Sequence, residues 1–460
     1  MSRKDKDRLS RRELREQKAE LKAQKAERKA KEKKQREKRR RPDYMLVSAM
    51  MLLFFSAFLL ISLQGELRLD GFILAVVVPL MLWIATMWMP RFFPADKLLL
   101  AIANFLCALG VLILYVTDRG AGTQRGMQQA MYYGVGILMM LICILFVRYV
   151  RRWNFLIKVV MLGAAGLMLL PLAIGTEQYG ATNWIVVGGM SLQPSEMVKI
   201  ALLLVLGWYM SQHRFWPWFI FAGFCLFALM LQKDLGTALI YYTTTLFLFW
   251  ASTGNLPLTG LGIVGGCGAA VVGYKMFAHV KKRVAIWRNP WLYYETSGYQ
   301  MVQALMAIAS GGLFGVGLGL GSPRVIPVYF SDAIFAVICE QFGILFGILV
   351  LVMYAILILR GASIANAARS GFHAIVAMGA TVMLGVQTFV IIGGVMKLIP
   401  LTGVTMPFVS YGGTSLVSCM GLIGLIQGVS SVNQDDLSYD YEISRSLNEL
   451  NAMKEADDQA

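Results

Sequence analysis

Histidine and cysteine are scarce in this sequence of 460 residues, which has three of the former and six of the latter. His213, His279 and His373 are far apart, which argues against a histidine-based metal site or a Ser-His-Asp triad. The cysteines stand singly in apolar runs and form no CxxC pair. We therefore expect them to be small buried hydrophobic residues.

The sequence also lacks a secretory cleavage pattern, a nucleic-acid-binding motif and the short alternating segments of a transmembrane β-barrel. Acidic residues are few, since 27 Asp and Glu face 43 Lys and Arg, for a net charge of +16. Residues 1–42 hold 20 of the basic and 8 of the acidic residues, whereas residues 431–460 hold 2 and 8. Because the basic excess lies mainly in one tail without a binding motif, we expect no nucleic-acid partner.

Hydrophobic residues make up 57% of the chain, and the mean hydropathy is +0.60. Soluble domains are roughly 45–50% apolar, and about 20 apolar residues cross a bilayer as a helix. We predict an all-α polytopic membrane protein with twelve spans, at about 44–63, 71–89, 97–116, 130–148, 155–175, 197–211, 215–231, 236–253, 258–279, 333–359, 373–396 and 412–430.

The distribution of basic residues predicts the orientation of these spans. The basic tail 1–42 and the short loops at 90–97 and 148–158 fall on the cytoplasmic side, as the positive-inside rule requires. The tail is expected to be solvated and partly helical, which is compatible with attachment to anionic membrane lipids. Twelve spans then place both termini in the cytoplasm and the motif-bearing loops outside.

The longest of these loops, Lys281 to Asp332, is polar and rich in glycine. Loops of this length without secondary structure are uncommon and often functional. It contains a basic cluster, an amphipathic run at 297–310 and a glycine-rich run at 311–321. The glycine-rich run is interpreted as a close-packed turn, or as backbone N–H groups free to approach phosphate.

Two charged pairs lie near predicted helix starts. Pro194 predicts a helix start, and Glu196 and Lys199 share one side of that helix because they are three residues apart. They are either a structural ion pair, or Lys199 faces a cavity and holds an anionic group. In the Lys233-Asp234 turn, Asp234 is interpreted as a helix N-cap.

The basic cluster comprises Lys281, Lys282, Arg283 and Arg288. Its predicted place outside, against the positive-inside bias, favours an anionic partner such as phosphate, although snorkelling to lipid headgroups is the alternative. Asp332, at the mouth of the next apolar segment, is either a helix N-cap or a carboxylate whose pKa is tuned for general-base catalysis.

Eight stretches in unbroken order resemble the SEDS family (shape, elongation, division and sporulation; RodA, FtsW and SpoVE). They are Asn183-Trp-Ile, Gln193-Pro-Ser-Glu-Met-Val-Lys199, Gln232-Lys-Asp-Leu-Gly-Thr-Ala238, Arg283 through Pro290, Ser297-Gly-Tyr-Gln-Met-Val-Gln303, Gly311 through Gly319, Ser331-Asp-Ala-Ile-Phe-Ala336 and Pro407-Phe-Val-Ser-Tyr-Gly-Gly-Thr-Ser415.

The resemblance implies a peptidoglycan glycosyltransferase that polymerises lipid II on the outer face of the bacterial cytoplasmic membrane, with a class B penicillin-binding protein as partner. Asp332 matches the essential aspartate of the family, and Trp184, Glu196, Lys199 and Asp234 match other motif positions. The remaining candidate substrate-binding residues are Lys281, Arg283, Gln300, Gln303 and Ser410. A divalent cation, Mg²⁺ or Mn²⁺, is a further candidate participant.

The resemblance also divides the chain into a basic tail (1–42), two extra N-terminal membrane helices (43–96), a ten-helix core (97–430) with the external loop 280–332, and an acidic cytoplasmic tail (431–460). The family's Pro-Glu-x-His-Thr-Asp is here Pro327 through Asp332 without the Glu and the His.

The mechanism that these residues suggest uses Arg283, Lys281 or Lys199 to hold the diphosphate and Asp332 as general base. Two other functions remain open from the sequence. One is a flippase or transporter for a lipid-linked precursor, and the other is a non-catalytic scaffold for a penicillin-binding protein.

Overall fold

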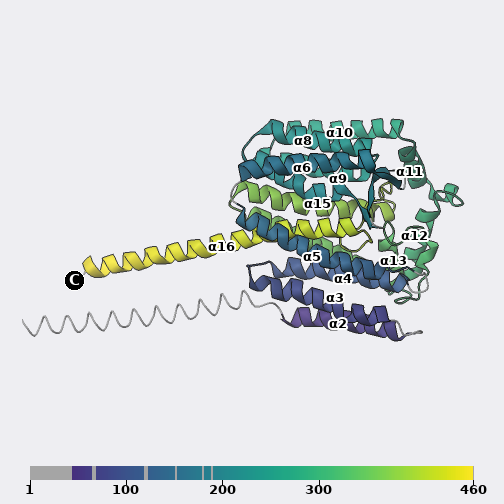
Figure 1. Ribbon diagram of the computed structural model, residues 1–460, viewed down its shortest axis with the longest axis horizontal. Helices are drawn as coiled ribbons and strands as arrows, with labels where there is room; N and C mark the ends of the chain where they lie inside the picture. The colour runs from purple at the N-terminus through teal and green to yellow at the C-terminus, as the bar shows by residue number, and fades with distance from the viewer. Residues whose placement is uncertain are drawn as a thin grey trace, which may run out of the picture.

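A computed structural model describes residues 44–64, 69–118, 123–150, 153–178, 181–187 and 190–458. The described chain is a bundle of long helices, most of them nearly parallel (Figure 1). The basic tail 1–42 and the Arg151-Arg152 pair of the predicted inner loop lie outside the described residues.

Nine helices in these ranges are long and apolar enough to cross a membrane. They are α2 (Tyr44–Leu63), α3 with the turns that extend it (Leu69–Arg91), α4 (Lys97–Asp118), α5 (Arg125–Tyr149), α6 (Trp153–Ile174), α10 (Leu256–Met276), α14 (Ile344–Asn366), α15 (Gly371–Val395) and α16 (Gly413–Asp458). Three further predicted spans are the helices α7 (Pro194–Ser211), α8 (Phe215–Leu231) and α9 (Leu235–Thr253). Helix α8 is apolar but has only 17 residues.

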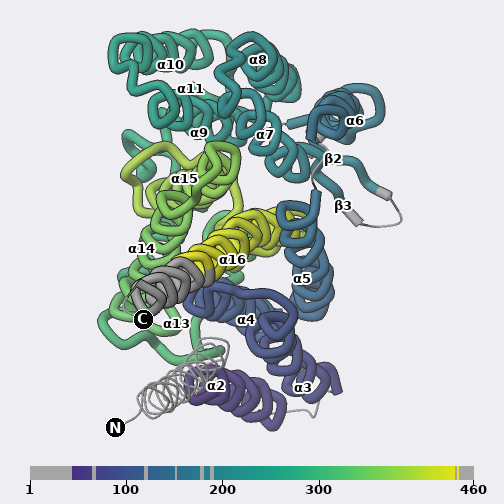
Figure 2. Tube along the Cα trace, turned by 90° about the vertical axis from the view of Figure 1, so that its left-hand side faces the viewer, coloured from purple at the N-terminus to yellow at the C-terminus, as the bar shows by residue number. Residues whose placement is uncertain are grey.

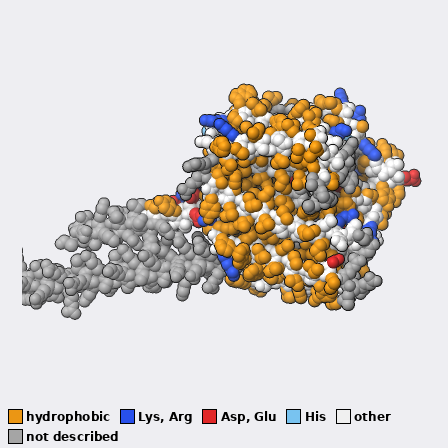
Figure 3. Space-filling model, in the orientation of Figure 1, with side chains coloured by type: hydrophobic (Ala, Val, Ile, Leu, Met, Phe, Trp, Pro, Cys, Tyr) orange, Lys and Arg blue, Asp and Glu red, His pale blue; other side chains and the backbone are white. Residues whose placement is uncertain are grey.

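The fold class predicted from hydropathy is confirmed. In a bilayer each backbone N–H and C=O group must be paired within its own segment, which favours helices wherever the chain is apolar. Hydrophobic side chains cover the face of the bundle shown in Figure 3, and Lys and Arg side chains lie mainly toward its two ends.

The predicted span 333–359 is wrong in one respect, because it consists of two helices. Helix α13 (Ile334–Phe342) ends at Gly343, where α14 begins. Gly343 has a φ of +84°, and a Cβ atom there would lie 2.3 Å from the carbonyl oxygen of Leu313. The glycine-rich turn therefore packs directly on the break, and only glycine fits at this position.

Helix α16 lies in the middle of the bundle, with α4 and α5 on one side and α14 and α15 on the other (Figure 2). Of its apolar window, 94% is buried. Its closest neighbour is α5, and a Cβ atom at Gly424 would lie 2.5 Å from the carbonyl oxygen of Met140. Small residues allow two membrane helices to approach this closely.

The predicted last span, 412–430, lies in the first part of helix α16. This helix runs without interruption for 46 residues, or about 69 Å, so that it continues through most of the predicted acidic tail. Arg148 Nη2 lies 2.8 Å from Asp435 Oδ2, and Arg369 pairs with Asp440. These pairs hold the helix where it leaves the bundle.

The long loop between α10 and α13 is not structureless. It contains α11 (Ala278–Arg288), η3 (Pro290–Tyr293), α12 (Tyr299–Gly311) and η4 (Pro323–Val325). The predicted amphipathic run 297–310 corresponds to α12, whose residues Met301, Val302 and Ala304 are buried. The loop therefore forms a small helical cap at one end of the bundle (Figure 1).

A second predicted loop, residues 176–194, contains a small antiparallel sheet. Strand β2 (Ala181–Val187) lies between β1 (Thr176–Gln178) and β3 (Met190–Leu192). Trp184 pairs with Thr176, and Ile185 pairs with Leu192. The sheet fixes the position of Asn183 and Trp184 beside the start of α7.

Five of the six cysteines are buried, as expected, whereas Cys267 on α10 is exposed. Helix α10 packs mainly on α9 and has only 6% of its apolar window buried. The expectation was wrong for Cys267 because composition cannot tell a membrane-facing helix from one inside the bundle.

Candidate functional site

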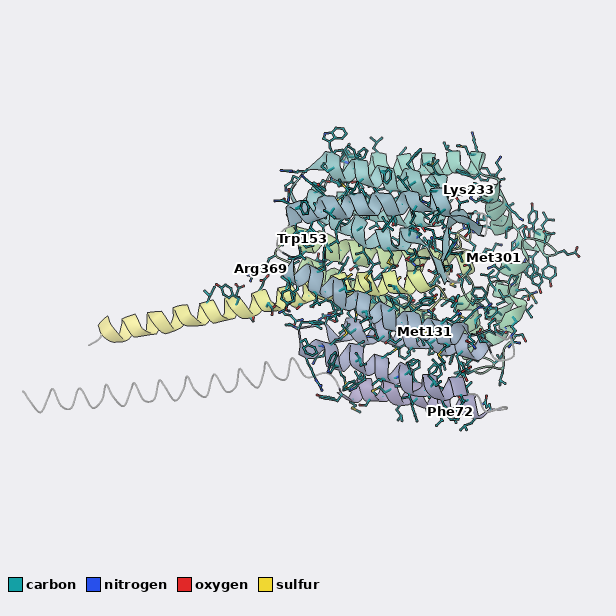
Figure 4. All side chains as sticks on the ribbon, in the orientation of Figure 1. Phe72, Met131, Trp153, Lys233, Met301 and Arg369 are labelled. Atoms are coloured by element: carbon teal, nitrogen blue, oxygen red, sulfur yellow. The ribbon has the colours of Figure 1, made fainter. Side chains whose placement is uncertain are left out.

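A cavity of about 540 Å³ opens at the end of the bundle where the motif-bearing segments meet. Its walls come from β2, the first turns of α7 and α9, helices α11 and α12, and residues 328, 330–332, 401–405 and 411–413. Figure 4 labels Lys233 and Met301 of this wall at one end of the bundle, with Trp153 and Arg369 at the other. Segments that are far apart in sequence thus form one site.

Six of the ten candidate site residues line this cavity: Trp184, Glu196, Asp234, Arg283, Gln300 and Asp332. The other four, Lys199, Lys281, Gln303 and Ser410, do not line it. Lys281 is exposed on α11, and Gln303 donates from Nε2 to the Tyr294 hydroxyl at 3.3 Å.

Asp332 is half-buried in the cavity wall. The Ser331 hydroxyl donates to its Oδ1 atom at 2.9 Å. Helix α13 begins two residues later and has no side-chain cap, so the interpretation of Asp332 as a helix N-cap is wrong. Burial raises the pKa of the Asp332 carboxyl, while the Ser331 hydrogen bond and the Arg283 charge partly offset this effect.

The loop between α15 and α16 holds the backbone at Asp332. The Ser410 hydroxyl donates to the carbonyl oxygen of Ser331 at 2.6 Å, and the Tyr411 N–H donates to that of Phe330 at 2.8 Å. Val328 has a φ of +52°, which is strained for a β-branched residue, and its carbonyl oxygen accepts from the Asp332 N–H. Strained backbone of this kind is often found at functional sites.

Arg283 enters the cavity from α11. Its Nη1 atom donates to the carbonyl oxygen of Thr402 at 2.8 Å, which fixes the guanidinium plane. A Cβ atom at Gly403 would lie 3.5 Å from Arg283 Nη2 and 3.6 Å from Asp332 Oδ2, so the cation and the carboxylate flank this glycine. Burial lowers the pKa of Arg283, and the charges of Asp332 and Asp234 oppose that effect.

Further basic groups line the same cavity. Lys233 lies at the turn into α9, and His279 and Lys282 lie on α11. Burial, together with the charges of Arg283 and Lys233, lowers the pKa of His279, which favours its neutral form. Lys282, Lys233 and Arg283 therefore supply the positive charge of this wall, which suits a phosphate-bearing ligand.

Asp234 serves the local fold, as predicted. Its Oδ1 atom accepts from the Thr237 N–H at 3.1 Å and caps α9. Its Oδ2 atom accepts from Asn183 at 2.7 Å and from Gln193 at 2.9 Å. The carboxylate therefore joins the sheet and the starts of α7 and α9.

Glu196 and Lys199 form the buried ion pair that their spacing predicts. Lys199 is 0% exposed, and its Nζ atom donates to both Glu196 oxygens at 2.8 Å and to Gln387 Oε1 at 2.9 Å. The Ser418 hydroxyl donates to Glu196 Oε2 at 2.6 Å. The ammonium is thus occupied inside the bundle, so the alternative that Lys199 holds an anion in the cavity is wrong.

Sequence reasoning missed Arg125, which supports the segment before Asp332. Its guanidinium carbon lies 4.0 Å from the ring centre of Phe330, and Nη1 is 3.2 Å from the Tyr329 hydroxyl and 3.6 Å from Asp118 Oδ1. A cation stacked on an aromatic ring contributes about 0.5–2 kcal/mol. No motif in the sequence connects positions 125 and 330, so only the folded structure reveals this contact.

Three polar atoms of lining residues have no hydrogen-bond partner in the described part of the chain. They are Gln300 Nε2, Asn183 Oδ1 and Thr402 Oγ1. Buried polar groups are usually paired. Donors and acceptors of this kind suit a ligand that carries hydroxyl and amide groups.

The described residues contain no group of three or more His, Cys, Asp or Glu side chains placed to hold a metal ion. Asp332 Oδ2 accepts no hydrogen bond from the described residues, whereas both oxygens of Asp234 are occupied. Mg²⁺ is usually bound through one or two carboxylates and substrate phosphates. Asp332 fits that mode of binding, but a cage made of protein ligands alone is not found in the part of the chain described here.

The chain is similar to proteins of one known family. The family model for cell cycle proteins of the FtsW, RodA and SpoVE type matches residues 96–435. The peptidoglycan glycosyltransferase RodA of Mycobacterium tuberculosis is 33% identical over 380 residues, which cover 74% of this chain and 79% of the relative. The stage V sporulation protein E of Bacillus subtilis is 32% identical over 359 residues, or 73% of this chain and 96% of that protein.

The solved structures show the same fold. RodA of Thermus thermophilus superposes with a TM-score of 0.54 at 25% identity, over 74% of this chain and 98% of that one. A chain from a peptidoglycan synthase complex gives a TM-score of 0.61 at 24% identity, over 74% and 98%.

The fold and the site therefore define a multi-pass membrane protein with a charged cavity at one end of its helical bundle. The chain belongs to the FtsW, RodA and SpoVE family, which confirms the predicted resemblance. Helices α2 (Tyr44–Leu63) and α3 (Leu69–Trp83) precede the matched region and are additional to it.

Proposed function

We propose that this protein is a peptidoglycan glycosyltransferase that polymerises lipid II into glycan strands. The observation that carries the proposal is that Asp332 and Arg283 flank Gly403 in a cavity of about 540 Å³. Relatives at 33% and 29% identity are named peptidoglycan glycosyltransferase RodA and probable peptidoglycan glycosyltransferase FtsW. The residues present supply a base and a cationic wall, which this reaction needs.

In the proposed reaction Asp332 takes the proton from the acceptor sugar hydroxyl. The oxygen attacks the anomeric carbon of the lipid-linked donor, a new glycosidic bond forms, and the bond to the diphosphate breaks. Undecaprenyl diphosphate leaves with the electron pair of that bond. Arg283 and Lys282 line the cavity where the charge of the leaving group would develop, and fixed cations stabilise such charge.

The raised pKa of Asp332 supports its role as a base. A carboxylate with a raised pKa accepts a proton more readily than an ordinary aspartate carboxylate. A divalent cation held by Asp332 and the substrate phosphates would add further stabilisation of negative charge.

The proposed orientation places the cavity on the outer face of the bacterial cytoplasmic membrane, with both termini inside. The basic composition of residues 1–42 supports it, because basic segments remain in the cytoplasm. A class B penicillin-binding protein is the proposed partner. A matched chain of this fold comes from a complex described as coordinating polymerization and crosslinking.

The test is strand synthesis from purified lipid II by the full chain, with and without a class B partner. Asp332→Asn keeps the shape and removes the base, and we expect a loss of about 10²–10⁴-fold, the usual contribution of general-base catalysis. Asp70→Asn, at an exposed position on α3, is the matched control and should retain wild-type activity.

Other outcomes would overturn the proposal. Polymer from the Asp332→Asn variant at the wild-type rate would keep the enzyme but remove Asp332 as its base. If folded wild-type protein gave no polymer with the partner present, the activity itself would be refuted. Transport of lipid II across vesicles that survives Asp332→Asn would then support a flippase.

A further inference from the structure

One side of helix α11 forms a wall of the cavity that contains Asp332. Four residues of this helix line the cavity: His279, Lys282, Arg283 and Ile286. They follow one another at i, i+3, i+4 and i+7, a spacing that places side chains on one face of a helix. The half-buried imidazole of His279 therefore shares its face of α11 with an ammonium and a guanidinium group.

A third cation reaches His279 from a different element. Lys233 lies in the turn between α8 and α9 and lines the same cavity (Figure 4). Its φ of +61° is held by the hydrogen bond from its N–H to the carbonyl oxygen of Met230 at 3.1 Å. The charges of Lys233 and Arg283 both act on His279. The imidazole thus lies between cations from two separate parts of the chain.

These cations keep their charge available. In the described part of the chain, Lys233, Lys282 and Arg283 form no salt bridge. The carboxylates whose charges act on Arg283 are those of Asp234 and Asp332. Both oxygens of Asp234 already accept hydrogen bonds, and Asp332 lies on the far side of a glycine. The wall can therefore hold a bound anion.

The ring of His279 is itself free to bind. It contacts the ring of Phe277, with a distance of 5.5 Å between the ring centres. Neither of its nitrogens has a hydrogen-bond partner within the described ranges. Burial and the two neighbouring cations lower the pKa of the imidazole, so the neutral form is favoured when no anion is bound.

We propose that a phosphate-bearing ligand binds in this cavity together with one proton from solvent, which His279 takes up. A phosphate between Lys233 and Arg283 offsets their repulsion of the imidazolium and adds an attraction of its own. The imidazolium N–H then donates to a phosphate oxygen in a charge-assisted hydrogen bond. A fourth cation thus forms only when the ligand is present. The proposal rests on the proposed function for the identity of the ligand, lipid II.

The coupling has a definite sign. The complex holds the charged imidazole at pH values at which the free protein holds the neutral one. Affinity should therefore rise as the pH falls within the range from about 8 to 5 in which histidines change charge. The diphosphate of lipid II is a diester whose own charge is constant over that range, so the change reports on the protein.

The experiment is titration calorimetry of the full chain in detergent with lipid II, in buffers of different ionisation enthalpy. We expect uptake of up to about one proton per lipid II, which corresponds to an affinity gain of up to about tenfold per pH unit. His279→Gln should bind without uptake. His279→Lys carries a permanent charge, so its affinity should be independent of pH and at least equal to that of the wild type at about pH 8.

Two further variants assign the proton. His213→Gln is the matched control, because His213 is exposed in the loop before α8 and does not line the cavity, and it should keep the uptake. Asp332→Asn should keep it as well. Loss of the uptake in Asp332→Asn, with uptake retained in His279→Gln, would assign the proton to the aspartate and overturn the proposal.

The remaining outcomes separate this proposal from the proposed function. Lipid II that binds to the wild type without proton uptake, and is polymerised, would overturn the role of His279 and leave the function in place. Uptake that is lost in His279→Gln, in a protein that makes no strands, would support the role of His279 and refute the polymerase. Folded protein that does not bind lipid II would overturn both. Because His279 makes no hydrogen bond in the described chain, its variants should fold.

Discussion

Removal of the charge of Arg283 should shift the pH dependence of strand synthesis. Arg283 and Asp332 flank Gly403. A Cβ atom at Gly403 would lie 3.5 Å from Arg283 Nη2 and 3.6 Å from Asp332 Oδ2, so these two atoms are at most about 7 Å apart. Unit charges at about 7 Å interact by roughly 0.6 kcal/mol in bulk water and roughly 2.4 kcal/mol at an effective dielectric constant of about 20. Loss of this interaction in Arg283→Gln should therefore raise the pKa of Asp332.

The direction follows from the charge. The guanidinium favours the ionised carboxylate, so its loss makes Asp332 harder to ionise. Since a general base works only when ionised, activity is lost as the pH falls through its pKa. The acidic limb of kcat/KM against pH should therefore move to higher pH in Arg283→Gln, and the maximum should fall because a phosphate contact is also lost.

Two variants separate charge from structure in this assay. Arg283→Lys keeps the charge and should leave the acidic limb within a few tenths of a pH unit of the wild type. Arg288→Gln removes the same charge from an exposed position on α11 that does not line the cavity, and should leave the limb unchanged. An acidic limb that stays in place in Arg283→Gln, or moves to lower pH, would refute the role of Asp332 as the titrating base.

Three further substitutions test other parts of the structure. Lys199→Met leaves Glu196 charged and unpaired in the bundle, so thermal unfolding in detergent should show a loss of about 3–5 kcal/mol, partly restored by adding Glu196→Gln. Ser410→Ala removes the hydroxyl that accepts from the Met406 N–H and donates to the carbonyl oxygen of Ser331. The free energy of unfolding should fall by about 1–3 kcal/mol in the same thermal assay, and no change would contradict this role. Arg125→Met removes the cation stacked on Phe330, so kcat should fall about tenfold with KM unchanged, and a change confined to KM would argue against a positioning role.

Much of the fold could be predicted from local sequence because the bilayer imposes local rules. An apolar run long enough to span must be helical, so every predicted span coincides with a helix or with two. Turn chemistry is equally local. Pro194 begins α7, and Asp234 caps α9, as the residue types predict.

The features that were missed depend on contacts between distant residues. The break at Gly343 lies in an apolar run and is caused by the turn at Leu313, thirty residues earlier. The spacing of Glu196 and Lys199 puts them on one side of a helix but cannot say what that side faces. Gln387, which lies on α15, completes the shell around the ammonium and keeps it out of the cavity.

The candidate site also combines features that the sequence predicts with features that only the fold reveals. The sequence identifies Asp332 and Arg283 as chemically suitable residues, and the fold brings them to either side of Gly403. The residues that hold them, Thr402 for the guanidinium and Ser410 for the aspartate segment, act partly through backbone carbonyl groups. Backbone contacts of this kind leave little trace in residue type.

The extra helices also change which sides of the bundle are open to the membrane. Helices α2 and α3 pack on α4, the first helix of the region matched by the family, and 94% of the apolar window of α4 is buried. A membrane helix of a second protein cannot reach α4 without displacing this pair. Lateral association must therefore use other flanks, such as α6 and α10, whose apolar windows are only 22% and 6% buried.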